Sequence, residues 1–349
     1  MNNLKYKDQT IYFKSSKNME EVDDSSIDVI ITSPPYNRKK SYSGDFGGEH
    51  NDNMTDEQYF KFLESVWSEC YRVAKNNGIF FLNIGDSAID QGKSEKVVKL
   101  AESVGWIRVQ DVIWVKSFLG RGHFTPSGGS KRFNNVWEHI YLLVKNKKEY
   151  KLDTKAIGIP YADKSNIGRY GDSDLRDPGN VWLIPYQKTT GLSVKKGHEA
   201  PFPIGLPYRC IKCVPNCKMV LDPFCGTGST LAACINLGVK GIGYEKYPRI
   251  KTIKQRLKEG LKFEPIAFTL IPHYELAIKL LCDYLNESNY FLSKPDSKKG
   301  LIENEILLDV IQNLQIKNSF TKKLRTIINR ANKKKDKSSL LNYFDINNK

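Results

Sequence analysis

The stretch Met219-Val220-Leu221-Asp222-Pro223-Phe224-Cys225-Gly226-Thr227-Gly228-Ser229-Thr230 decides the fold, because a short apolar strand runs directly into a glycine-rich turn. Residues 229–237 then have the apolar pattern of a helix, and residues 240–244 have the pattern of a second strand. Glycines let a backbone approach a ligand closely, and a helix N-terminus attracts a carboxylate or a phosphate. The stretch therefore predicts a nucleotide-binding βαβ unit.

An acidic residue completes this predicted nucleotide site. Glu245 ends the second strand, in the sequence Gly241-Ile242-Gly243-Tyr244-Glu245, at the place where an acid typically holds ribose hydroxyls. The third glycine of a dinucleotide fingerprint is replaced by Leu231, which counts against NAD. The pattern favours another nucleoside-bearing ligand and leaves an NAD-dependent oxidoreductase as a weaker alternative.

A second motif follows another buried strand, early in the chain. Residues 27–31 are short, apolar and β-branched, and the strand has to end at Thr32-Ser33-Pro34-Pro35-Tyr36-Asn37 because two prolines cannot continue a ladder. The Pro34 carbonyl and the Ser33 hydroxyl can act as rigid acceptors for the hydrogens of an exocyclic base amine, which is a poor nucleophile. The ring of Tyr36 offers a flat face to a base turned out of its helix. Taken alone, Pro34-Pro35-Tyr36 is equally typical of a turn that ends a strand.

The rest of the chain alternates strands and helices, which is typical of βαβ folds. Thr55 is the expected N-cap of a helix that runs to about Lys75 and ends at Asn76-Asn77-Gly78. Further strands are expected at 79–84, 108–115 and 137–145, and further helices at 94–104 and 203–213. Between 146 and 200 the pattern dissolves into Gly, Asp, Lys, Tyr and Pro, which indicates a substrate-facing segment.

Composition limits the class of protein. A formal net charge of +15 attracts polyanions, with nucleic acid as the natural partner, although a general lysine bias would give the same charge. No apolar run approaches a membrane span and no secretory signal is evident, so we expect a soluble, cytoplasmic protein without a membrane partner.

The seven cysteines are expected to be reduced. Cys210, Cys213 and Cys217 have C-x2-C-x3-C spacing, but without a fourth ligand at finger spacing they favour one helical face over a zinc site.

The order of the two motifs along the chain points to one particular protein family. Ser-Pro-Pro-Tyr first and Asp-Pro-Phe-Cys-Gly-Thr-Gly later resembles the β-group of DNA amino-methyltransferases, the N4-cytosine and N6-adenine family of restriction-modification systems. The similarity covers about residues 20–260 and includes 82–86, 134–139, 179–182 and 198–203. It implies an α/β, Rossmann-like S-adenosylmethionine-dependent methyltransferase fold with a mostly parallel sheet, a circularly permuted motif order and a C-terminal helical extension.

The resemblance also implies roles for individual residues. The catalytic loop would be Ser33, Pro34, Pro35 and Tyr36, and Asp86 would support that loop by hydrogen bonding, with a solvated turn as the alternative for Asp86. S-adenosylmethionine would be held by the glycine turn, by Glu245 at the ribose and by the segment 198–203 over the methionine, for which a helix N-cap region is the alternative. The implied cofactor-binding residues are Asp222, Pro223, Phe224, Gly226, Thr227, Gly228, Ser229, Thr230, Glu245, His198 and Pro203. No metal is expected.

These expectations divide the chain into four parts. Residues 1–145 form the catalytic half of the methyltransferase domain, and residues 146–197 form a DNA-target-recognition segment. Residues 198–264 form the cofactor-binding half, and residues 265–349 form a basic helical extension for which DNA contact is slightly favoured over a packed tail. Candidate DNA contacts lie at 117–134 and 146–197, and they are Arg121, Lys131, Arg132, Arg169 and Arg176.

The resemblance leads to a specific hypothesis about the reaction. Family members with Ser in the first motif position are mostly cytosine-N4 enzymes, so Ser33 favours direct in-line methyl transfer to N4 of a flipped cytosine in double-stranded DNA. Cys225 lies in the cofactor turn and is not expected to be a nucleophile. The alternatives are an N6-adenine DNA methyltransferase, then an RNA methyltransferase or a noncatalytic nucleic-acid-binding scaffold. A cognate restriction endonuclease is the expected system partner, and the chain is expected to be a monomer or a homodimer.

Overall fold

The computed structural model describes residues 3–37, 54–86, 90–116, 135–159, 161, 164–169, 171–184 and 202–263 of the 349-residue chain. The chain divides into two units, Met1–Thr269 and Leu270–Lys349, and every described residue belongs to the first unit. The predicted extension beyond 265 and the segment 117–134 lie outside the described residues. The roles predicted for both therefore stay predictions.

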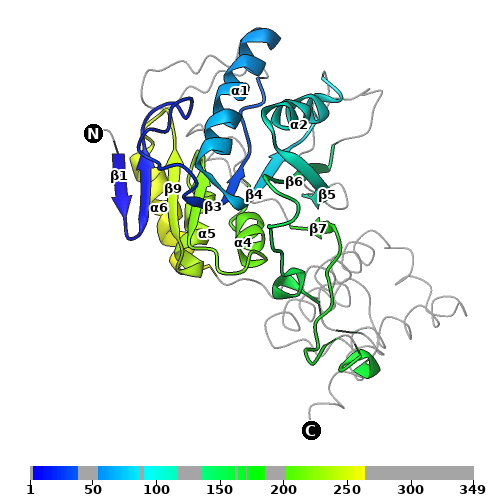
Figure 1. Ribbon diagram of the computed structural model, residues 1–349. Coiled ribbons are helices and arrows are strands. Elements are labelled where there is room, and N and C mark those ends of the chain that lie inside the picture. The colour runs from blue at the N-terminus through cyan, green and yellow to red at the C-terminus, as the bar shows by residue number, and fades with distance from the viewer. Residues whose placement is uncertain are drawn as a thin grey trace, which may run out of the picture. The chain divides into compact units, whose positions relative to one another are not determined.

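A nine-stranded mixed sheet forms the centre of the described chain (Figure 1). Its strands are β1 (Asn3–Tyr6), β2 (Gln9–Tyr12), β3 (Ile27–Thr32), β4 (Ala74–Ile84), β5 (Ile107–Val115), β6 (Trp137–Val144), β7 (Val181–Leu183), β8 (Met219–Asp222) and β9 (Lys240–Tyr244). They lie in the order β1-β2-β9-β8-β3-β4-β6-β5-β7. From β2 to β4 all neighbours are parallel, β1 pairs with β2 antiparallel, and β6 is antiparallel to both β4 and β5. The predicted α/β class and mostly parallel sheet are confirmed.

Helices cover both faces of this sheet (Figure 1). The first face carries α1 (Asp56–Val73) and α2 (Lys93–Val104). The second face carries α4 (Gly205–Lys212) and α5 (Ser229–Leu237), with α6 (Ile250–Leu261) packed beside α5. Short 3-10 turns lie at Thr154–Ile157 and Lys164–Asn166. Because successive residues of a strand point to opposite faces, Ile30 joins the core under α1 whereas Val29 and Ile31 join the core under α4 and α5.

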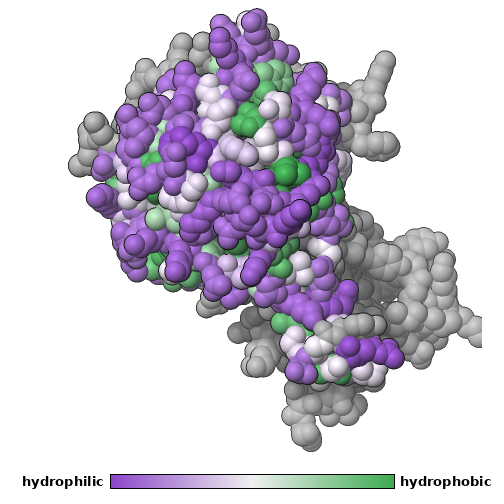
Figure 2. All heavy atoms as spheres, in the orientation of Figure 1, coloured by the Kyte–Doolittle hydropathy of each residue, from purple (hydrophilic) through white to green (hydrophobic). Residues whose placement is uncertain are grey.

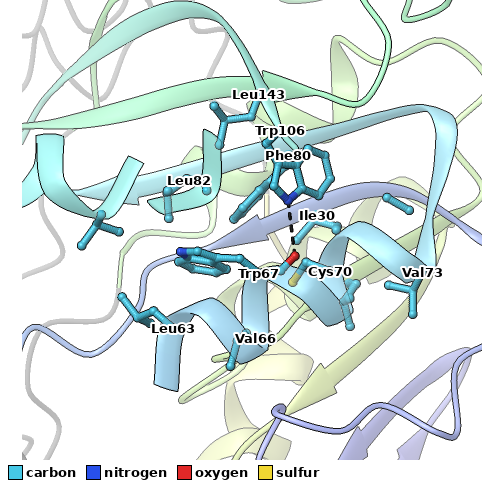
Figure 3. Packing of buried hydrophobic residues seen from close by; sticks show 14 of the residues in the cluster. Ile30, Leu63, Val66, Trp67, Cys70, Val73, Phe80, Leu82, Trp106 and Leu143 are labelled. Atoms are coloured by element: carbon cyan, nitrogen blue, oxygen red, sulfur yellow. Dashed lines mark hydrogen bonds between the residues drawn. The ribbon is translucent and has the colours of Figure 1, made fainter. Parts of the chain in front are cut away.

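Large aromatic side chains fill the core between α1, α2 and the sheet (Figure 3). The ring centroid of Trp67 lies 5.2 Å from that of Phe80, and Phe80 lies 5.1 Å from Trp106. The indole N–H of Trp106 donates to the backbone carbonyl of Trp67 at 3.4 Å. This packing fixes α1 against the sheet, and thereby fixes the position of the N-terminus of α1.

Helix α1 begins where the sequence predicts and ends earlier. Thr55 is its N-cap and forms a capping box with Gln58, which satisfies two backbone N–H groups reciprocally. The prediction that the helix continues to about Lys75 and stops at Asn76-Asn77-Gly78 is wrong, because Ala74 already takes an extended conformation and begins β4. The pairing of β3 with β4 shifts register between Ile27 and Val29, so residues 75–78 are accommodated there as an irregularity within the strand.

Three strands and one α-helix have no counterpart in the sequence-based expectations. Strands β1 and β2 form a short hairpin, and β2 continues the sheet by pairing with β9 at the other end of the described chain. Strand β7 lies within the segment 146–197 and pairs with β5, so part of that segment extends the sheet. Helix α6 covers β1, β2 and α5 through Ile253 and Leu257. These strands have three or four residues each, which is too short for a periodic pattern to stand out.

The three cysteines with C-x2-C-x3-C spacing pack into the core under α4. Cys210 and Cys213 are buried and Cys217 is partly buried, and burial raises the pKa of all three thiols. In the part of the chain that the structure describes, no group of three or more His, Cys, Asp and Glu side chains is placed to hold a metal ion. These cysteines therefore contribute apolar packing.

The molecular surface is mainly hydrophilic on the face drawn in Figure 2, with separate hydrophobic patches between charged side chains. Of the large hydrophobic side chains in the described ranges, those most exposed are Ile107, Trp137, Ile167, Val181 and Leu261. None of the described helices combines the length and the apolarity that a bilayer crossing requires.

Replacement of Trp67 by Ala is expected to lower the free energy of unfolding by about 3 to 5 kcal/mol, because it leaves a cavity among Phe80, Trp106 and the sheet. Urea unfolding followed by circular dichroism measures the change. Leu261→Ala is the matched control, because that side chain is 46% exposed and its loss should cost less than about 1 kcal/mol. Equal losses for the two variants would contradict the role assigned to this core.

Candidate functional site

The two motifs meet at the point where the sheet changes direction of winding. Strands β8 and β3 are neighbours in the sheet, but β8 is followed by α5 on one face and β3 by α1 on the other. In an open α/β sheet, ligands bind in the crevice at the carboxyl ends of such a pair of strands. The loop 33–37 leaves β3 there and the glycine turn leaves β8 there. The fold thus brings the two predicted motifs to one crevice.

A buried carboxylate ties the two motifs together. Asp222, the last residue of β8, accepts hydrogen bonds from the Thr32 hydroxyl at 2.6 Å, the Thr230 hydroxyl at 2.5 Å and the backbone N–H of Phe224 at 3.1 Å. Burial raises the pKa of Asp222 to about 6, although these three donors oppose the rise. Thr32 directly precedes Ser33, so this carboxylate sets the distance between the catalytic-loop candidate and the glycine turn.

The glycine turn has the shape of a cradle. Gly226 and Gly228 have φ values of 52° and 91°, in the left-handed region that favours glycine. A Cβ atom on Gly226 would meet no atom closer than the Phe224 carbonyl oxygen at 4.0 Å, so the space above this glycine is open. The buried hydroxyls of Thr227 and Ser229 have no hydrogen-bond partner within the described part of the chain. Open space, unpaired hydroxyls and the N-terminus of α5 fit a ligand with polar and anionic groups.

The turn is held against β9, which carries the predicted acid. The backbone N–H of Cys225 donates to the Tyr244 carbonyl at 2.9 Å, and a Cβ on Gly243 would lie 2.9 Å from the Cys225 side chain. Glu245 follows directly, and burial raises the pKa of its carboxyl to about 7 against the lowering effects of the Tyr247 and Gly226 backbone N–H groups and the Arg249 charge. Its carboxyl therefore lies at the glycine turn, and its role at a ribose stays a prediction.

The loop after β3 is fixed at three points. The Tyr59 hydroxyl donates to the Pro35 carbonyl oxygen at 2.6 Å, and the Gly85 backbone N–H donates to the Tyr36 hydroxyl at 3.1 Å. The Asn37 side chain donates to the Met54 carbonyl and accepts from the Met54 N–H. These contacts hold Pro35, Tyr36 and Asn37 in place before any ligand binds.

Two hydrogen-bond acceptors of the loop have no partner among the described residues and are available to a ligand. Ser33 is partly buried and Pro34 is buried, at the carboxyl end of β3. Within the described residues, neither the Ser33 hydroxyl nor the Pro34 carbonyl takes part in a hydrogen bond. Unsatisfied acceptors on a loop this firmly held are suited to a ligand that brings hydrogen-bond donors.

Asp86 lies next to the loop but bonds elsewhere. Its carboxylate accepts from the backbone N–H groups of Gly92 and Ser94 at the start of α2, and its carbonyl accepts from Asn135. Burial alone would raise the pKa of Asp86, but the hydrogen bonds from Ser94 and Gly92 outweigh it and lower the pKa. The neighbouring Gly85, which the sequence-based reasoning did not single out, makes the direct contact with the loop.

The remaining predicted residues have different outcomes. Pro203 is buried just before α4, where its carbonyl accepts from the Leu206 N–H at 3.1 Å. His198 lies outside the described residues, so its role stays a prediction. Thr32, Tyr59 and Gly85 were missed, since no sequence signal distinguishes a threonine, tyrosine or glycine whose partner is remote along the chain.

A doubly wound sheet with a glycine turn, an acid and a proline-rich loop at one crevice defines a class of α/β nucleotide-binding proteins. Residues 27–256 match the family model of N6/N4 methyltransferases, described as DNA methylase. The chain belongs to the N6/N4 DNA methylase family, because this match covers more than half of its residues.

Individual relatives extend this comparison. Type II methyltransferase M.MthZI of Methanothermobacter thermautotrophicus is 27% identical over 288 residues, which cover 72% of this chain and 77% of that protein. DNA adenine methyltransferase YhdJ of Escherichia coli (strain K12) is 26% identical, over 65% of this chain and 74% of that protein. Among solved structures, the PvuII DNA methyltransferase (cytosine-N4-specific) is similar with a TM-score of 0.52 and 19% identity, over 73% of this chain and 93% of that chain, which supports the fold.

Replacement of Asp222 by Asn is expected to remove a pH dependence of stability. Since burial raises the pKa of Asp222 in the fold to about 6, its contribution to stability is complete below about pH 4 and is lost as pH rises through about 6. The wild type should therefore lose about 3 kcal/mol relative to Asp222→Asn between about pH 4 and about pH 8. Urea unfolding across this range measures the difference.

The exposed carboxyl of Asp172 provides the control for that experiment. Asp172→Asn should change the free energy of unfolding by less than about 0.5 kcal/mol, as expected for an exposed substitution. A stability difference between wild type and Asp222→Asn that stays constant with pH would show that Asp222 titrates in the fold as it does in the unfolded chain.

Proposed function

We propose that this chain is an S-adenosylmethionine-dependent DNA methyltransferase that methylates the exocyclic N4 of a cytosine turned out of double-stranded DNA. The observation that carries the proposal is the pair of available acceptors, the Ser33 hydroxyl and the Pro34 carbonyl, on a loop tied to the glycine turn through Thr32 and Asp222. One motif would hold the amine and the other would hold the methyl donor.

The catalytic loop would act on the base amine through its two acceptors. An exocyclic amine has two hydrogens, and its nitrogen becomes a better nucleophile when both are bound in a geometry that favours a pyramidal nitrogen. The Pro34 carbonyl and the Ser33 hydroxyl would accept one hydrogen each and would stabilise the positive charge that develops on nitrogen. The Gly85 N–H holds the Tyr36 hydroxyl, so the Tyr36 ring would meet the flipped base with little loss of conformational freedom.

The glycine turn and β9 would hold the cofactor. When bound, S-adenosylmethionine supplies a methyl group on a sulfonium, which is electrophilic without any metal. Glu245 would accept the ribose hydroxyls, while the unpaired hydroxyls of Thr227 and Ser229 and the N-terminus of α5 would bind the polar methionine end. By the family resemblance, residues 198–203 would cover the methionine and Asp86 would support the loop. Because the Asp86 carboxylate bonds to Gly92 and Ser94, its support of the loop would be indirect, through the adjacent Gly85.

The choice of cytosine rests on Ser33. The relatives include one named as a DNA adenine methyltransferase, and a protein of the same fold is titled cytosine-N4-specific, so their names point to both bases. Within the resembled group, Ser in the first motif position marks mostly cytosine-N4 enzymes. A neutral hydroxyl is a weaker acceptor than the carboxylate that mostly marks adenine-N6 enzymes, so the motif alone leaves adenine as the alternative target.

Duplex DNA is the proposed substrate, and a restriction endonuclease of the same specificity is the proposed system partner. The net charge of +15 favours encounter with a polyanion, and the relatives named as type II methyltransferases support a role in a restriction-modification system. Arg169 and Arg176 are exposed on the segment 146–197, where they would be available to DNA phosphates.

Incubation with labelled S-adenosylmethionine and duplex DNA of varied sequence is expected to label DNA, and mass spectrometry of the nucleosides should identify N4-methylcytosine. Ser33→Ala should lower turnover by about 10- to 100-fold, because one of two preorganised acceptors is lost, while the dissociation constant of the cofactor changes less than about twofold. Ser103→Ala, an exposed serine on α2, is the control and should keep wild-type turnover.

The alternatives have distinct outcomes in the same experiment. If N6-methyladenine is found instead of N4-methylcytosine, the target base is adenine and the cytosine proposal is wrong. Preferential labelling of RNA in competition with duplex DNA would make the chain an RNA methyltransferase. Cofactor binding without transfer to any nucleic acid would favour a noncatalytic scaffold, and unchanged turnover in Ser33→Ala would contradict the role of that residue.

Binding of S-adenosylmethionine is expected to strengthen as pH rises from about 6 to about 8. Burial raises the pKa of Glu245 to about 7, and only the ionised carboxylate can accept both ribose hydroxyls. The ionised fraction rises about tenfold across this range, so the dissociation constant should fall about tenfold when measured by calorimetry. Glu245→Gln should bind more weakly at high pH and show a flat profile. A profile of unchanged slope in Glu245→Gln would assign the titration to another group.

A further inference from the structure

The N-terminal end of α1 and the residue before its N-cap contact the catalytic loop at two places. Met54, directly before the N-cap Thr55, exchanges two hydrogen bonds with the Asn37 side chain, at 2.8 and 3.0 Å. Tyr59, one turn into the helix, donates its hydroxyl to the Pro35 carbonyl at 2.6 Å. The capping box at Thr55 and the aromatic core around Trp67 fix this turn against the sheet. The loop is therefore seated on a rigid support.

A buried cation stands over the ring of Tyr59. Lys93, the first residue of α2, is 4% exposed, and its ammonium nitrogen lies 4.9 Å from the centre of the Tyr59 ring. The same nitrogen lies 3.1 Å from the Asp90 carboxylate. A buried ammonium group is costly unless it is paired, and here a carboxylate and an aromatic face share that task. The cation also draws electron density from the phenol ring, which makes the Tyr59 hydroxyl a stronger hydrogen-bond donor.

This arrangement distinguishes the two carbonyls of the Pro-Pro step. The Pro35 carbonyl is occupied by Tyr59, whereas the Pro34 carbonyl has no hydrogen-bond partner in the described part of the chain. Because neither proline has an N–H to bind, the carbonyls are the only backbone groups through which this step can be held. Occupying the second carbonyl fixes the peptide plane between Pro35 and Tyr36 and, through the rigid rings, the direction of the carbonyl before it.

We propose that Tyr59 and Lys93 are positioning residues, in which Lys93 strengthens the hydrogen bond from Tyr59 to the Pro35 carbonyl and this bond aims the Pro34 carbonyl at the target amine. The proposal rests on the proposed function, in which the loop holds a base amine. Neither residue touches the base or the cofactor in this scheme. They act through the loop alone.

Tyr59→Phe tests the proposal because it removes one hydroxyl and keeps the buried ring. The rate of single-turnover methylation should fall about tenfold, as expected for an acceptor that is no longer held in its reactive geometry. The dissociation constants for S-adenosylmethionine and for a DNA duplex should change less than about twofold, since the lost bond is internal to the protein. A rate within about twofold of wild type, or a loss confined to either dissociation constant, would overturn the proposal.

A matched pair on the same helix separates positioning from general destabilisation. Lys145 lies 4.5 Å from the centre of the Tyr71 ring, which is also on α1 but about three turns beyond Tyr59. Tyr71→Phe and Lys145→Met should leave the single-turnover rate unchanged. Introduced alone, Lys93→Met should lower the single-turnover rate about threefold to tenfold. Introduced together with Tyr59→Phe it should lower the rate little further, because both substitutions act through one hydrogen bond. Fully additive losses would overturn the role of Lys93.

Amide hydrogen exchange tests the same proposal without activity. The Gly85 N–H is bonded to the Tyr36 hydroxyl, so it reports on whether the loop stays in place. In Tyr59→Phe the amides of Gly85, Tyr36 and Asn37 should exchange at least about fivefold faster, while the amides of β4 interior residues keep their rates. If the wild type transfers no methyl group, the proposed function fails but this result still decides whether Tyr59 positions the loop. Unchanged exchange at all three amides would overturn the positioning role.

Discussion

The hydrogen bonds between Asp222 and the two threonines Thr32 and Thr230 are the constraint on which the site depends. A carboxylate this deeply buried is costly in free energy, and the two hydroxyls and the Phe224 N–H offset that cost only while all three segments stay in place. The carboxylate belongs to the end of β8, one hydroxyl to the end of β3 and the other to the first turn of α5. Displacement of any of these segments removes one of the three donors to a buried carboxylate, which is costly, so these hydrogen bonds favour a single geometry of the crevice.

The rest of the fold supports this centre from both sides. On one side the aromatic core holds α1, whose first turn carries the loop after β3 through Met54 and Tyr59. On the other side, β9 holds the glycine turn through the bond from Cys225 to the Tyr244 carbonyl, and Gly243 leaves room for that approach. The hairpin β1-β2 adds a further neighbour to β9, since the Tyr12 carbonyl accepts from the Glu245 N–H. Residues that are far apart in the sequence, from Tyr12 to Glu245, therefore converge at the carboxyl ends of the central strands.

Most long and regular helices and strands were predicted correctly from the sequence, whereas several short or irregular ones were not. Strands with several β-branched residues, such as β3, and helices with a clear cap, such as α1 after Thr55, were anticipated within a few residues. The end of α1 was misjudged because Asn76-Asn77-Gly78 resembles a helix terminator, whereas pairing with β3 draws these residues into an irregular strand. The hairpin at the N-terminus and β7 were missed, since three or four residues have no period and gain their stability from distant partners.

The sequence by itself determined the two motifs, their order, the acid at Glu245 and the membership of a family, because those features depend on residue types at short spacings. Only the tertiary structure decided that Asp222 bridges the motifs, that Gly85 rather than Asp86 contacts Tyr36, and that the Pro35 carbonyl is occupied while the Pro34 carbonyl is available. The physical reason is the range of the interactions. A hydrogen bond requires two groups within about 3 Å, and when those groups are tens to hundreds of residues apart, only the packed sheet and helices determine which of them meet.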